Sequence, residues 1–239
     1  MIRRPPRSTL SSSSAASDVY KRQVVHPSIT PVFSVLDPDL TVGLPTYPTA
    51  TCGFDVLTHA IEAFVSIGAN AYSDSIALEA ISKVAGNLRG VVTDGQDIEA
   101  RSQMLLGSAL AAQAFNVTGL GSAHGTGHAI SARLDAAHGQ TLATMLPHVM
   151  DYNMTVREEK YAEVAKILAP KSPATGAGAI DAVLKLRSDI GIDRSITDLG
   201  GESDLLNILL EDAMADPVNR TNPRPVDQAG FEMMYNAAW

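Results

Sequence analysis

Residues 51–64, TCGFDVLTHAIEAF, carry the pattern that decides the fold, since their apolar positions recur at helical spacing. Asp55 and His59 are four residues apart, which is just over one helical turn, so both side chains project from one face. A carboxylate amid apolar neighbours is costly to bury unless a charge or a metal compensates it. Glu62 follows His59 by three residues, near the same face, and we assign it to the solvated surface.

Residues 121–139, GSAHGTGHAISARLDAAHG, hold a second polar cluster. His124 and His128 are also four residues apart, and His138 follows after a turn. A single histidine on an apolar helix is more often a hydrogen-bonded core residue than a ligand, but several histidines in short segments change that balance. Imidazoles combined with a carboxylate suit Fe(II), Zn or another first-row divalent ion. The two stretches therefore predict a divalent metal site, and the hypothesis to be tested is that this metal binds an alcohol oxygen.

The histidine spacing separates this chain from two classes of metallopeptidase. Zincins need glutamate directly after the first histidine of the pair as general base, and Gly125 stands there. In metzincins the third histidine follows ten residues after the first, whereas His138 follows fourteen residues after His124. The chain also lacks the serine elbow of hydrolases and the phosphate loop of nucleotide hydrolases. Peptidase, serine hydrolase and nucleotide hydrolase activities have no support.

Composition favours closely packed helices in an acidic protein. The 239 residues are 45% hydrophobic and only 5% aromatic, which is more typical of helices than of a β-sandwich. A formal charge of -8 disfavours nucleic acid and anionic membrane as partners. One cysteine excludes an intrachain disulfide framework, and no apolar run has the length of a membrane span. We predict a cytoplasmic protein.

Helical patterns continue to the end of the chain, joined by loops that contain proline and glycine. Pro147 should kink or interrupt the helix that contains it. Helices are expected over residues 49–66, 73–88, 102–115, 124–133, 138–152, 157–168, 176–190, 203–213 and 225–237.

The first part of the chain differs from the rest. Residues 1–23 are rich in serine and arginine, and we interpret them as translated adapter sequence, in preference to a targeting peptide, outside the fold. Residues 24–47 contain a short run, VFSVL, which predicts a single strand with no sheet to join. Residues 48–239 show no linker that would divide them, and we expect one all-α domain there.

The combined motifs resemble the iron-containing (group III) alcohol dehydrogenase family, and most closely its branch that acts on small primary alcohols, diols and lactaldehyde. The resemblance implies a mainly α fold. This fold would be an all-helical metal-binding domain similar to the C-terminal domain of dehydroquinate synthase. The resemblance also implies that the strand is the remnant of a missing N-terminal α/β nucleotide-binding domain. The runs that carry the resemblance are DPDLTVGLPTYPTATCGFDVLTHAIEAFVS, GLGSAHGTGHAISARLDAAHG and LPHVMDYN.

The resemblance also implies roles for individual residues. The metal ligands would be Asp55, His59, His124 and His138. His128 would lie beside the metal and the nicotinamide without being a ligand, either relaying the alcohol proton or in a purely structural role. The metal would be Fe(II), with Zn as the alternative.

A nicotinamide cofactor, NAD or NADP, is implied together with a small alcohol or aldehyde substrate, and a homo-oligomer is compatible with the resemblance. Leu40 matches the family's loop beside the cofactor. Ala129 and Ala137 stand where the family often has proline, so the substrate is left open. Two other functions remain: an inactive fragment that binds only metal or partner subunits, without measurable NAD(P) binding, and a metal-dependent hydrolase using the same ligands.

Overall fold

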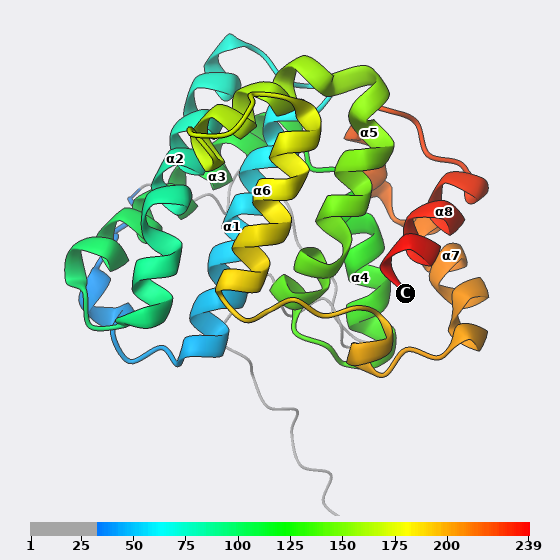
Figure 1. The fold of residues 1–239 in the computed structure, drawn as a ribbon, viewed down its shortest axis with the longest axis horizontal. Helices are drawn as coiled ribbons and strands as arrows, with labels where there is room; N and C mark the ends of the chain where they lie inside the picture. Colours follow the sequence, from blue (N-terminus) through cyan, green and yellow to red (C-terminus); the bar gives the residue numbers. More distant parts are fainter. Residues whose placement is uncertain (1–32) are drawn as a thin grey trace, which may run out of the picture.

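Helices form all the regular structure of residues 33–239, the part of the chain that this computed structural model describes (Figure 1). The expectation of a mainly α fold is confirmed for these residues. In chain order the elements are η3 Pro38–Thr41, α1 Thr46–Val65, α2 Ala71–Thr93, α3 Ile98–Thr118, α4 Ser122–Leu134, α5 His138–Leu168, α6 Gly176–Asp189, η4 Thr197–Leu199, η5 Ser203–Leu205, α7 Leu206–Ala215, η6 Pro217–Thr221 and α8 Gln228–Ala238.

Helix α1 is the central element of the bundle. It packs against α2, α3 and α5, and in Figure 1 it runs through the middle of the molecule behind α6. Its apolar residues are almost completely buried, with Phe54 and Leu57 at 0% exposure. A helix surrounded in this way has to place its polar side chains against other helices, which is how Asp55 and His59 come to lie inside the protein.

Helix α2 begins with a reciprocal cap. The Asn70 side chain accepts hydrogen bonds from the backbone N–H groups of Tyr72 and Ser73, and the Ser73 hydroxyl accepts one from the Asn70 N–H. These bonds satisfy donors that the first helical turn leaves without intrahelical partners.

The replacement Asn70→Ala is expected to lower the free energy of unfolding by about 1 kcal/mol, because alanine cannot accept those bonds. Denaturant-induced unfolding of both proteins measures the difference. The exposed Asn116, which caps no helix N-terminus, is the matched position for a control Asn→Ala change. Equal stability losses at the two positions would contradict the capping role.

Helix α5 continues through Pro147, so the interruption predicted there as one of two outcomes is wrong. Proline lacks the N–H that would bond to the carbonyl of Ala143, four residues earlier. Arg187 of α6 donates to that carbonyl instead, at 3.0 Å. The one non-helical residue inside α5 is Arg157, with φ -139° and ψ 19°, which agrees with the separate helix predicted from residue 157.

The strand predicted over VFSVL is also wrong for its described part. Residues 33–36 form no strand, and the described chain offers no strand to pair with them. The preceding residues of that prediction, 24–32, lie outside the described part of the structure, as does the predicted leader over residues 1–23.

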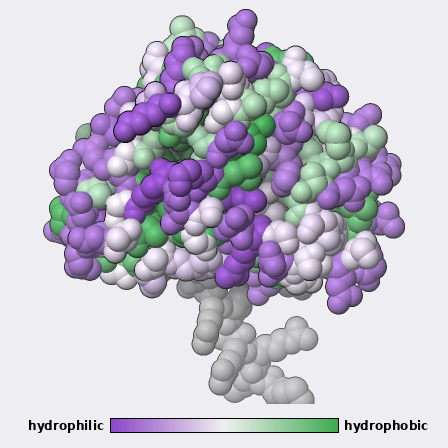
Figure 2. Space-filling view, in the orientation of Figure 1, coloured by the Kyte–Doolittle hydropathy of each residue, from purple (hydrophilic) through white to green (hydrophobic). Residues whose placement is uncertain are grey.

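Hydrophilic residues cover much of the face seen in Figure 2, with smaller hydrophobic areas between them. Among residues 33–239 no single helix is long and apolar enough to cross a membrane. Only α3 and α4 taken together, bent by 107° at their break, have the required length and composition.

Candidate metal centre

Three imidazoles converge on one oxygen of Asp55. The Nε2 atom of His59, one turn along α1, lies 3.3 Å from Asp55 Oδ1. His124 of α4 brings its Nε2 to 3.5 Å from the same oxygen, and His138, the first residue of α5, brings its Nε2 to 3.8 Å. Three helices thus present their polar atoms to a single point inside the bundle.

Two buried polar atoms of this cluster, Asp55 Oδ1 and His124 Nε2, have no hydrogen-bond partner among residues 33–239. A ligand atom from each of Asp55, His124 and His138 lies within 4.8 Å of the others. His59 is outside that tightest group, although it contacts Asp55. Nitrogen and oxygen donors that converge without protein partners fit a first-row divalent cation.

Burial and neighbouring charges shift the pKa values of the four side chains in this cluster. Burial raises the pKa of Asp55, but the close approach of His124 and the charges of His59 and His138 outweigh burial and lower this pKa to about 2. Burial lowers the pKa values of His59 and His138 to about 4 each. Burial also acts to lower the pKa of His124, whereas the charge and hydrogen bond of Glu62 and the close approach of Asp55 raise it to about 9. At neutral pH the first three groups have the protonation states that metal ligands need.

Glu62 is buried, so its assignment to the solvated surface is wrong. Its side chain is only 4% exposed, and its Oε2 atom lies 2.5 Å from Nδ1 of His124. It is on the same face of α1 as His59, three residues away. The three-residue spacing from His59 already indicated that Glu62 faces the site. Its partner in α4 comes 62 residues later and could not be deduced from α1 alone.

His128 lies beside the cluster and is more open than the other imidazoles. Its side chain is 33% exposed, and its ring centroid is 5.3 Å from that of His138 and 5.8 Å from that of His124. Its Nδ1 atom lies 2.7 Å from Oδ2 of Asp216. Asp216 also caps η6, by accepting from Val218 N–H. Sequence reasoning missed Asp216, which has no motif spacing to the histidines.

Burial raises the pKa of Asp216, while its hydrogen bond with His128 and the backbone bond from Val218 lower it, with a net decrease. The Asp216 carboxylate accepts a hydrogen bond from Nδ1–H of His128, so Nε2 is the accepting nitrogen of this ring. Leu40, the predicted cofactor contact, lies apart from these residues in η3 and is 84% exposed.

The helical bundle that carries this histidine–carboxylate centre is shared with a known class of proteins. Residues 49–239 match the model described as Fe-containing alcohol dehydrogenase family, C-terminal. The chain therefore belongs to the Fe-containing alcohol dehydrogenase family, a family of oxidoreductase enzymes, and the resemblance seen in the sequence is confirmed.

The similar proteins are alcohol dehydrogenases, diol dehydrogenases and aldehyde reductases by name. The probable alcohol dehydrogenase EutG of Escherichia coli K12 is 36% identical over 218 residues, which cover 91% of this chain and 55% of EutG. The 1,3-propanediol dehydrogenase of Klebsiella pneumoniae is 35% identical, over 87% of this chain and 55% of that protein. The lactaldehyde reductase of E. coli K12 is 34% identical, over 90% of this chain and 57% of that protein. The chain spans about half the length of these relatives.

Solved structures give the same result. The crystal structure of a 1,3-propanediol oxidoreductase superposes with a TM-score of 0.81 and 36% identity, and covers 85% of this chain and 55% of that one. The iron-containing alcohol dehydrogenase of Thermococcus thioreducens superposes with a TM-score of 0.82 and 28% identity, covering 90% and 56%.

Proposed function

We propose that this chain contributes the metal centre of an oxidoreductase that interconverts a small primary alcohol and its aldehyde with a nicotinamide cofactor. The observation that carries the proposal is the convergence of three imidazole Nε2 atoms on the unpartnered Oδ1 of Asp55, in a chain of this family. Asp55, His59, His124 and His138 are proposed as ligands of Fe(II), with Zn as the alternative.

The bound metal would act as a Lewis acid on the substrate oxygen, and the nicotinamide would accept or donate the hydride. His128 is proposed to hold the substrate hydroxyl proton at Nε2, since its other nitrogen is engaged by Asp216. The contact between Nδ1 and Asp216 thus favours a proton relay by His128 over a purely structural role. Leu40, exposed on η3, remains a proposed cofactor contact. Cytoplasmic location remains a prediction from the low cysteine content.

The relatives suggest the substrates to test. One is named for 1,3-propanediol and another for lactaldehyde, so three-carbon diols and hydroxyaldehydes are the proposed class. The alternative proposal, that this chain binds metal or partner subunits without catalysis, is compatible with its covering about half of each relative.

Metal analysis after anaerobic loading tests the proposal. The purified chain is incubated with Fe(II) or Zn(II), desalted, and assayed for metal content and for NAD- or NADP-linked oxidation of 1,3-propanediol. We expect about one metal ion per chain, since one centre supplies four ligands. Failure to retain either ion would overturn the metal site. Metal retention without oxidation of the diol would favour the non-catalytic alternative.

A further inference from the structure

Glu62 stands where helix α4 begins. The N-cap residue of α4 is Gly121, which has no side chain to accept a hydrogen bond. The Glu62 Oε1 atom, from α1, accepts from the backbone N–H of Ala123 at 2.7 Å. The first N–H groups of a helix lack intrahelical partners and carry partial positive charge, so a carboxylate there is favourable. A side chain of α1 therefore caps α4.

The second oxygen of Glu62 contacts His124 from the side away from Asp55. Oε2 lies 2.5 Å from His124 Nδ1, and both side chains are almost fully buried, at 4% and 2% exposure. A carboxylate oxygen accepts, so the proton of this bond is on Nδ1. The other ring nitrogen, Nε2, faces Asp55 Oδ1 at 3.5 Å and has no hydrogen-bond partner.

We propose that Glu62 is a positioning residue for the metal centre, which holds His124 through Nδ1 on the side away from the site, so that Nε2 is the nitrogen presented to the metal. The inference rests on the proposed function, because it concerns how the same centre takes up a divalent cation. A carboxylate that holds the second nitrogen of a ligating histidine fixes the tautomer and the ring orientation, and it increases the basicity of the ligand.

The surrounding backbone leaves little freedom for Glu62. A Cβ atom added at Gly121 would lie 3.0 Å from Glu62 Oε1, so the loop before α4 passes directly over the carboxylate. Glu62 also shares one face of α1 with Asp55 and His59. The same helix face thus carries two proposed ligands and the group that orients a third.

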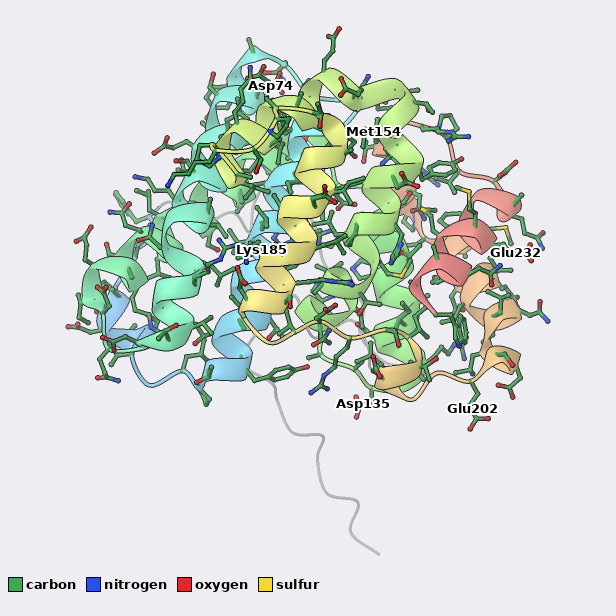
Figure 3. The ribbon with its side chains drawn as sticks, viewed as in Figure 1. Asp74, Asp135, Met154, Lys185, Glu202 and Glu232 are labelled. Atoms are coloured by element: carbon green, nitrogen blue, oxygen red, sulfur yellow. The ribbon has the colours of Figure 1, made fainter. Side chains whose placement is uncertain are left out.

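The replacement Glu62→Gln tests the inference because an amide has only one accepting oxygen. If that oxygen takes the Ala123 N–H, the amide NH₂ faces His124 Nδ1, and the ring proton has to move to Nε2, which points into the site. We expect Zn(II) affinity, measured alone by competition with a chelator, to fall by about 10–100-fold. The matched control is Glu232→Gln, at an exposed position on α8 (Figure 3), and it should leave Zn(II) affinity unchanged.

A double-mutant comparison separates positioning from a general effect on the fold. The loss caused by Glu62→Gln should disappear in a His124→Gln background and persist in a His138→Gln background. Equal losses in both backgrounds, or an unchanged affinity of Glu62→Gln, would overturn this inference while leaving the metal site intact. A wild-type chain that binds no Zn(II) would instead overturn the site, and this inference with it.

If Glu62→Gln does not fold, Glu62→Asp provides the second variant. Aspartate keeps the charge but shortens the reach by one methylene, so it cannot hold both Ala123 N–H and His124 Nδ1 in the same geometry. Its Zn(II) affinity is expected between those of the wild type and of a chain lacking the carboxylate. Wild-type affinity of a folded Glu62→Asp chain would overturn the inference.

Discussion

Asp55→Ala is expected to weaken Zn(II) or Fe(II) binding by more than about 100-fold, the upper range for loss of a group that only supports a ligand. The reason is geometric, since His59, His124 and His138 all direct Nε2 at the same Asp55 oxygen. Removing it takes away the carboxylate oxygen on which they converge. Titration of the metal-free chain with each ion, followed by calorimetry or chelator competition, measures the change.

Asp181→Ala is the matched control for this prediction. Asp181 is exposed on α6, so alanine there should leave metal affinity at the wild-type value. Asp55→Asn keeps the shape but replaces the charged oxygen with a neutral amide oxygen, and an intermediate affinity is expected. Wild-type metal binding by both Asp55 variants would refute the ligand assignment.

Gly139→Ala is expected to destabilise the chain by about 1–3 kcal/mol or more and to weaken metal binding at the same time. A Cβ atom at Gly139 would meet the carbonyl oxygen of Thr51 and lie 2.6 Å from its carbonyl carbon. These are backbone atoms of α1, which cannot rotate away, so α5 would have to move. His138 is the preceding residue, and its Nε2 would move relative to Asp55.

Gly86→Ala provides the control at a position without contacts. Nothing lies within 4 Å of a Cβ atom built there, in the interior of α2. Alanine is favoured over glycine in a helix, and we expect equal or greater stability, by up to about 1 kcal/mol. Denaturant unfolding and Zn(II) titration of both variants are the measurements. A Gly139→Ala chain as stable as Gly86→Ala would show that the close approach of the two helices is unimportant.

Local periodicity in the sequence was enough to predict most helices. The four-residue spacings of Asp55 with His59 and of His124 with His128 put each pair on one helix face, and the structure brings both faces together. Helix ends were less predictable, because caps such as that of Asn70 depend on a few residues.

The partners of the imidazoles could not be predicted from local pattern. Glu62 was expected in solvent, and its burial depends on α4, which folds against α1 from far along the chain. Asp216 is the residue between α7 and the short 3₁₀ helix η6, a position that no periodicity identifies. Pro147 was expected to kink or interrupt α5, but the helix continues, and Arg187 of another helix supplies the missing donor. Each of these errors comes from a contact between residues that are distant in the sequence.

The 3₁₀ helix η6 has a consequence for the order in which the centre is assembled. Asp216 reaches His128 across 88 residues, Asn222 accepts from Ser122 N–H across 100, and Thr221 donates to the Leu120 carbonyl across 101. Such contacts form only after a long loop has closed. During synthesis α4 leaves the ribosome well before these partners do. His128 therefore reaches its final arrangement only after the η6 segment has folded against α4.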